Sequence, residues 1–249
     1  MLLMHTLYRL SRLRCAGLAG LLVGAAALPA TVNAAMLREG FSGTTVSRGW
    51  QNVPDVWGGD LAISTGETLG VAPMRGDSML QFLSSGGSLT SSSLSSSDIY
   101  RTIDLTGMID QVTEGNVLVR ASYYVNRVGG DAQTDSRFGI GIHAYAGDTG
   151  SFSRQVNNPL DLRRESILSD ADTSTWQRVT VDLVLPTNTT FVAIWIGAQE
   201  NVFNDTGGAG PEFDGHFADD VLVRVRQVPA PAGAGIMLLG GLTLLRRRR

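Results

Sequence analysis

The sequence predicts an all-β protein: a single β-sandwich, of the jelly-roll type, between two apolar terminal segments. Two observations predict this fold. Short apolar runs that alternate with polar residues recur between residues 116 and 225, as expected for strands with one buried face. No long run of helical periodicity occurs in the same region, and the connections are rich in Gly, Asn, Asp and Ser, which favour turns. One domain, residues 35–227, therefore accounts for the centre of the chain.

Residues 1–34 predict a secretory signal peptide with a helical apolar core. Three arginines and no acid precede residue 15, a small apolar stretch follows over Ala16–Ala30, and Val32–Ala34 offers the small residues that a signal peptidase recognises. Cleavage is expected after Ala34, and an uncleaved first membrane helix is the alternative. Cys15, the single cysteine, is removed with this segment, so the mature domain has no thiol and no disulfide.

Five apolar runs predict the strands of the sandwich. In each of them residues of one face recur at every second position, except in one run that is apolar on both faces and therefore predicts a central strand. The alternating runs are Asn116–Val125, Phe138–Ala146, Arg178–Leu185 and the closing Val221–Val225, and the doubly apolar run is Phe191–Ile196.

Two segments predict connections. Residues 84–97 consist largely of Ser and Gly and predict a loop or an irregular edge. Residues 157–172 also predict a loop, with one short helical turn over 162–167.

The C-terminal segment, residues 228–249, has three parts. Val228, Pro229, Ala230 and Pro231 break the last strand, an uncharged run over 232–245 predicts a short transmembrane helix, and Arg246, Arg247, Arg248 and Arg249 end the chain. The arginines favour the cytoplasmic side, which places the domain outside. A 14-residue helix spans only about 21 Å of a hydrocarbon core of roughly 30 Å, so the span is short.

This three-part order resembles the PEP-CTERM sorting signal. In that motif the residue between the prolines is usually Glu, and here it is Ala230. The resemblance implies that an exosortase-type enzyme processes an exported protein that is anchored in the inner membrane during sorting. It then implies release to the cell surface or the exopolysaccharide matrix. A simple C-terminal membrane anchor is the alternative.

Three short motifs of the domain resemble galactose-binding-like jelly rolls, the fold of many carbohydrate-binding modules. They are Glu39–Phe41, Trp176 with Val179–Val181, and Phe217–Val221. In such modules the first and last strands often share a structural calcium, and the resemblance implies Glu39 and Asp220, with neighbouring Asp219, as its ligands.

The residues themselves also favour a cation near the last strand. Four carboxylates lie within nine residues beside His216, and clustered carboxylates suit calcium. A solvated acidic loop is the alternative reading. The carboxylates are Glu212, Asp214, Asp219 and Asp220.

A ligand platform is predicted on the outward face of the 138–146 strand. His143 and Tyr145 lie on that face beside Gly139 and Gly141, which leave room for a sugar ring to approach the backbone. Tyr124 and Arg120, from the outward face of the 116–125 strand, are expected to join the platform. An ordinary sheet face is the alternative. Of the four tryptophans, Trp50 and Trp57 are further ligand candidates, whereas Trp176 and Trp195 are expected to serve packing.

Charge and motifs exclude several functions. The 20 arginines include seven in the terminal segments and all 23 acids lie between those segments, so the domain carries 13 − 23 = −10. This charge gives no support for nucleic-acid binding. No catalytic motif is present, so no catalytic residue is assigned. The sequence therefore predicts an exported, non-catalytic surface or matrix protein that binds polysaccharide, and the alternatives are an extracellular glycan hydrolase and a purely structural matrix protein.

Overall fold

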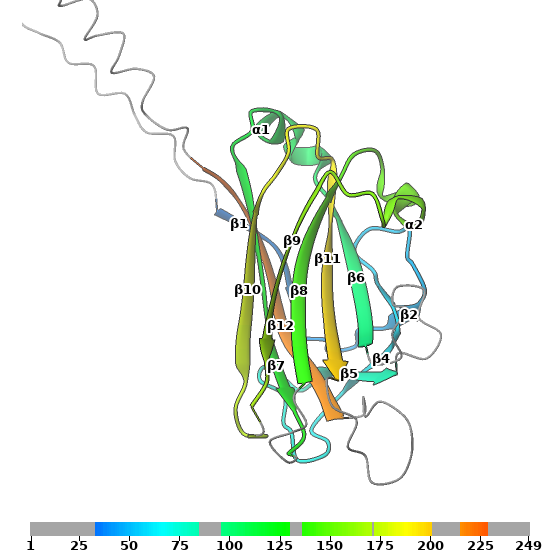
Figure 1. Ribbon diagram of the computed structural model, residues 1–249, viewed down its shortest axis with the longest axis vertical. Coiled ribbons are helices and arrows are strands. Elements are labelled where there is room, and N and C mark those ends of the chain that lie inside the picture. The colour runs from blue at the N-terminus through cyan, green and yellow to red at the C-terminus, as the bar shows by residue number, and fades with distance from the viewer. Residues whose placement is uncertain (1–32, 85–95, 130–135, 171, 201–214, 229–249) are drawn as a thin grey trace, which may run out of the picture.

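A computed structural model describes residues 33–84, 96–129, 136–170, 172–200 and 215–228, which form a sandwich of two six-stranded sheets (Figure 1). The first sheet contains β1 (Asn33–Glu39), β4 (Leu61–Thr65), β5 (Met79–Ser84), β7 (Val117–Arg127), β10 (Gln177–Val184) and β12 (His216–Gln227). The second contains β2 (Val46–Arg48), β3 (Trp57–Gly59), β6 (Ser96–Asp104), β8 (Ser136–Tyr145), β9 (Asp161–Leu168) and β11 (Phe191–Glu200).

The strand order is that of a jelly roll. The eight strands from β5 to β12 form two antiparallel sets, ordered β5-β12-β7-β10 in the first sheet and β6-β11-β8-β9 in the second. The chain passes between the sheets at nearly every connection, which is how two Greek keys wrap into a double-sheet roll. The predicted all-β jelly roll is confirmed by this order.

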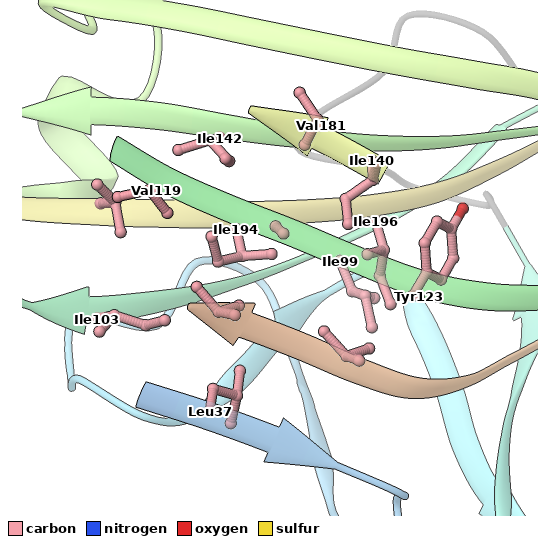
Figure 2. Close-up of a cluster of buried hydrophobic side chains, with 14 of the residues drawn as sticks. Leu37, Ile99, Ile103, Val119, Tyr123, Ile140, Ile142, Val181, Ile194 and Ile196 are labelled. Carbon is pink, nitrogen blue, oxygen red and sulfur yellow. The ribbon is translucent and has the colours of Figure 1, made fainter. Parts of the chain in front are cut away.

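The core lies between the sheets and follows from the alternation of the strands. Val119 and Tyr123 of β7 face Ile140 and Ile142 of β8, and all four are fully buried (Figure 2). β10 shows the simplest pattern, since Val179, Val181 and Leu183 are buried while their neighbours in sequence are exposed. Burial at every second position is what keeps each strand in register with the core.

Most predicted strands are confirmed. β7, β8 and β10 match the alternating runs within two residues, and β11, the strand that is apolar on both faces, lies between β6 and β8 as a central strand should. The helical turn predicted over 162–167 is wrong, because these residues form β9, which pairs with β8 over eight positions. The described helices are short and lie in connections: α1 (Ile109–Thr113), α2 (Phe152–Gln155), and the 3₁₀ turns Thr106–Met108 and Thr149–Ser151.

The two terminal segments fall largely outside the described residues. β1 begins at Asn33 and pairs with β12, so two residues assigned to the signal peptide belong to a described strand. Val228 is the last described residue of the predicted sorting motif. Among the described residues no helix is both long and apolar enough to cross a bilayer, and the predicted membrane segment 232–245 lies beyond them.

Candidate functional site

The outward face of the second sheet is built from cross-strand rows that bring glycines together. One row runs Asp98, Gly197, Gly139, Ser166 across β6, β11, β8 and β9. The next row on the same face runs Tyr100, Trp195, Gly141, Arg164. Three glycines on two central strands present no side chain on this face, and we call Gly139, Gly141 and Gly197 the glycine floor.

The indole of Trp195 occupies the space above the glycine floor. A Cβ atom placed on Gly139 would lie 2.5 Å from Trp195 Cη2, and one placed on Gly197 would lie 2.8 Å from Trp195 Cζ2. Both distances are shorter than any stable carbon–carbon contact, so only glycine at these positions lets the ring rest on the sheet. Tryptophan packing over a neighbouring-strand glycine is a known way of covering exposed backbone.

Beside Trp195 lies an open pocket of about 360 Å³. Its wall combines one aromatic ring with charged and hydrogen-bonding groups, an arrangement typical of small-molecule sites. Four wall side chains make no side-chain hydrogen bond or ion pair with any described residue, and so are available to a ligand: Arg137, Glu165, Ser166 and Gln199. We call this site the Trp195 pocket; its lining is Ser96, Asp98, Arg137, Gly139, Arg164, Glu165, Ser166, Trp195, Gly197, Ala198 and Gln199.

Two polar contacts fix the orientation of Trp195. Its Nε1 donates a hydrogen bond to Asp98 Oδ1 at 2.8 Å, across the strand pair β11–β6. The guanidinium carbon of Arg164 lies 4.8 Å from the centre of the indole, which is cation–π distance. A ring held at its polar edge and against a cation is pre-organised, so binding a ligand costs less ordering.

Arg164 is itself held by a buried chain of polar groups. Its Nε donates to His143 Nε2 at 3.2 Å, and His143 Nδ1 lies 3.4 Å from the Tyr145 hydroxyl, which donates to the Val156 carbonyl at 2.9 Å. These contacts assign the proton of the neutral imidazole to Nδ1. Burial and, secondarily, the charge of Arg164 lower the pKa of His143 to about 4, so the ring is neutral at physiological pH.

The glycine floor is also supported from the core side. The hydroxyl of Tyr123, on β7 of the opposite sheet, lies 2.7 Å from the Gly139 carbonyl oxygen, to which it donates, and 3.3 Å from that of Gly197. Tyr123 is fully buried and burial raises the pKa of its hydroxyl well above the ordinary value, so it remains a donor. The floor is therefore fixed between an indole outside and a phenol inside.

The predicted platform is corrected by the structure in two respects. His143 is 2% exposed and Tyr145 is fully buried, so neither presents a ring to solvent. Tyr124 and Arg120 lie on β7, whose outward face is on the other side of the sandwich. They face Arg178 and Asp182 instead. Alternation alone could not show that His143 and Tyr145 lie beneath neighbouring side chains.

The division of the tryptophans between packing and ligand-facing positions differs from the prediction. Trp57 is a core residue, and Trp50 packs on Tyr100 and Phe152 with ring centres 4.7 and 5.5 Å away. Trp176 serves packing as predicted, against a small cluster that contains Phe217. Trp195 packs against the buried cluster that contains Tyr100 and Phe191, as predicted, and its half-buried ring also lines the pocket. The signal that identifies it is its register: it lies opposite Gly141 on the outward face.

The carboxylates predicted to bind calcium have other partners. Glu39 accepts hydrogen bonds from Arg101, Thr44 and the amide of Phe41. Asp220 is paired with Arg38 at 2.9 Å, and Asp219 accepts from the amide of Arg75. No group of three or more His, Cys, Asp or Glu side chains suited to a metal occurs within the described ranges. Glu212 and Asp214 lie outside them, so calcium remains a prediction without geometric support here.

Ser136 and His216 form a Ser–His contact that is buried. Ser136 Oγ lies 2.6 Å from His216 Nε2, and both residues are buried. Because Ser136 belongs to β8 and His216 to β12, the contact joins the two sheets. Its burial and position fit a structural tie.

Comparisons with known proteins give distant structural similarities. No protein-family model matches the chain, and no curated protein sequence matches it. It is similar in structure to TmCBM61, a module solved with β-1,4-galactotriose, at 12% identity, covering 67% of this chain and 85% of that one with a TM-score of 0.39. It is similar to the CBM22-1 xylan-binding domain of Paenibacillus barcinonensis Xyn10C at 13% identity, covering 80% and 97% with a TM-score of 0.42.

An enzymatic domain is also among the similar structures. The enzymatically active domain of tailspike protein 4 from bacteriophage CBA120 matches at 8% identity and a TM-score of 0.39, and the match covers 67% of this chain but only 19% of that one. What these three proteins bind or cleave is a property of those proteins. The fold assigned to this chain rests on its own strand order.

Proposed function

We propose that this protein is a non-catalytic polysaccharide-binding protein of the cell exterior and that the Trp195 pocket holds one sugar unit of the polymer. The observation that carries the proposal is an outward, pre-organised indole on a glycine floor, next to four polar side chains that make no side-chain hydrogen bond or ion pair with another described residue. Sugars present apolar C–H faces and many hydroxyls, and this wall offers the exposed part of a half-buried indole together with donors and acceptors.

The chemistry of the wall favours binding over turnover. Asp98 already accepts the hydrogen bond of Trp195 Nε1. Glycoside hydrolysis needs an acid and a second carboxylate across the scissile bond. An Asp98–Glu165 pair would therefore have to work while one member is committed to positioning the ring. A glycan hydrolase and a purely structural matrix protein remain the alternatives to be tested.

The test is binding to a panel of neutral polysaccharides (xylan, galactan and glucan) by full-length protein and by Trp195→Ala. Loss of a central aromatic contact costs about 2 kcal/mol or more, so affinity should fall roughly thirtyfold. Tyr124→Ala, which removes an aromatic ring from the opposite face, is the matched control and should bind as wild type does. Release of reducing sugar would replace the proposal with the hydrolase, and no binding to any of the panel would favour the structural protein.

Export and sorting complete the proposal. The signal peptide over 1–34 and the segment 228–249 would bring the domain to the cell surface or the extracellular matrix by way of signal peptidase and an exosortase-type enzyme. The intact mass of the surface-located protein tests this. We expect a chain that starts near Ala35 and lacks the four terminal arginines. Retention of those arginines would leave a membrane anchor in place of sorting.

A further inference from the structure

Five arginines lie on the outward face of the first sheet. β10, β7, β12 and β1 follow one another across this sheet, and each contributes at least one of them (Figure 1). They alternate with buried core residues, which places their side chains on the side away from the second sheet. We call this set the arginine face: Arg38, Arg120, Arg178, Arg224 and Arg226.

The arrangement of the arginine face is not explained by folding. Arg120 and Arg224 are direct cross-strand partners, and like charges in that position destabilise a sheet. Asp182 neutralises Arg120 at 2.6 Å, and Asp220 neutralises Arg38. Arg224 and Arg226 are exposed and form no side-chain hydrogen bond or ion pair with the residues that the structure describes.

The arginine face carries a positive net charge, whereas the domain as a whole is negatively charged. Its five arginines and two aspartates leave a local charge of +3, whereas the domain between residues 35 and 227 carries −10. At physiological ionic strength charges more than about 8 Å apart are largely screened. A ligand thin enough to lie within that distance of the sheet therefore experiences mainly the arginines.

We propose that the arginine face is a second binding surface, which takes a single anionic polysaccharide chain that carries carboxylate groups. Guanidinium groups match carboxylates with two parallel hydrogen bonds, and arginine needs no structural change to offer them. Arg224 and Arg226, two residues apart on β12, supply a pair without a side-chain hydrogen bond or ion pair to any described residue, and Arg178, which is stacked on Tyr124 at 5.8 Å, extends the row.

The size of the patch selects a thin polymer. A membrane or a long nucleic acid presents anionic charge over a broad area and meets the rest of the acidic domain as well as the arginines. One polysaccharide strand follows the arginines alone. The surface lies on the sheet opposite the Trp195 pocket, so this inference is independent of the proposed function.

The experiment measures binding of polygalacturonate to full-length protein at several salt concentrations. Wild type should bind, with affinity that falls as salt rises. Arg224→Ala/Arg226→Ala should bind at least tenfold more weakly and show a shallower salt dependence, by roughly one to two units in the log–log slope. The matched control Arg48→Ala/Arg154→Ala removes the same charge from exposed sites elsewhere and should bind as wild type does. Trp195→Ala should also retain this binding.

Three results would overturn the inference. Equal loss in the control pair would show that only net charge matters. Undiminished binding by Arg224→Ala/Arg226→Ala would locate the polymer elsewhere. Binding to a single-stranded oligonucleotide or to phosphatidylglycerol vesicles, but not to polygalacturonate, would assign the face to another partner. Neutral-polysaccharide binding by the same variants reports on the Trp195 pocket, so a failure of either proposal is recognised separately.

Discussion

At the residue scale, the core and the site meet at the peptide groups of Gly139 and Gly197. These glycines belong to the outward set of β8 and β11, yet their carbonyls lie within reach of the Tyr123 hydroxyl from the other sheet. A buried hydrogen bond of this kind contributes about 1 kcal/mol net, and here it also fixes the height of the pocket floor. If the pocket binds sugar as proposed, the same residues serve both stability and ligand positioning.

Gly139→Ala tests whether the Trp195 ring requires a residue without a side chain beneath it. The new methyl group would lie 2.5 Å from Trp195 Cη2, so either the ring tilts off the floor or the strand shifts. We expect destabilisation of about 1–3 kcal/mol in urea unfolding and loss of neutral-polysaccharide binding. Gly107→Ala is the matched control, because a Cβ at that exposed position meets nothing within 4 Å. Normal binding by Gly139→Ala would mean that the indole does not need the floor.

At the element scale, the chain from Tyr145 through His143 and Arg164 to Trp195 ties β8, β9 and β11 together on the outward face. His143 is the titratable member. The groups that face it are Arg164 from β9, Tyr145 beside it on β8, and Tyr100 from β6, whose ring centre lies 6.0 Å away. None of them is an acid, so nothing there stabilises an imidazolium.

The buried imidazole predicts a pH dependence of stability. The pKa of His143 is lowered from 6.5 to about 4 by burial and Arg164. Between these two pH values the ring is therefore protonated in the unfolded chain and neutral in the folded chain. The contribution of the neutral His143 ring to the free energy of unfolding is fully present above pH 6.5 and declines as pH falls towards 4. It totals about 3 kcal/mol. Urea unfolding at pH 7.5 and pH 4 should show a smaller loss for His143→Gln than for wild type.

Asp219 changes the stability in the opposite direction to His143 as the pH falls, so it supplies the control. Burial raises its pKa from 3.8 to about 6, although backbone hydrogen bonds oppose the shift, so protonation stabilises the folded state as pH falls from 6 to 3.8. Asp219→Asn should therefore enlarge the acid-induced loss that His143→Gln reduces. The explanation fails if His143→Gln loses as much stability as wild type over the same pH range.

The elements show which features a sequence can predict. β7, β8 and β10 were predictable because large apolar residues recur at every second position, and β11 because it is apolar on both faces. β9 was not predictable, because residues 161–166 and Leu168 are exposed and only Ile167 is partly buried. An exposed edge strand is specified by its hydrogen bonds to β8, and these leave no hydrophobic pattern.

The sequence predicted some of the residues of the site but not their arrangement in space. The glycines of β8 were predicted to leave space for a ligand, whereas the indole of Trp195 fills the space above Gly139. The tryptophan that uses the space lies 54 residues after Gly141, and only the β8–β11 register brings the two together. The depth of His143 and Tyr145 also depends on residues from other elements, Phe152 and Phe191 among them.

At the scale of the whole molecule, the sandwich separates two unlike surfaces. The Trp195 pocket lies on the outward face of the second sheet and the arginine face on that of the first, with the packed core between them. A rigid core keeps the two surfaces pointing in opposite directions, so one ligand cannot reach both sites by a short path. If both proposals hold, the protein binds two different polymers at once.

The prediction that follows is cross-linking. If both surfaces bind, full-length protein mixed with the preferred neutral polysaccharide and polygalacturonate should retain each polymer in the presence of the other, because the sites do not overlap. In a pull-down on immobilised neutral polysaccharide, wild type should carry polygalacturonate with it. Trp195→Ala should fail to attach to the immobilised polymer, and Arg224→Ala/Arg226→Ala should attach without carrying the acidic one. Competition between the two polymers for wild type would show a single shared site, and the two-faced arrangement would then be wrong.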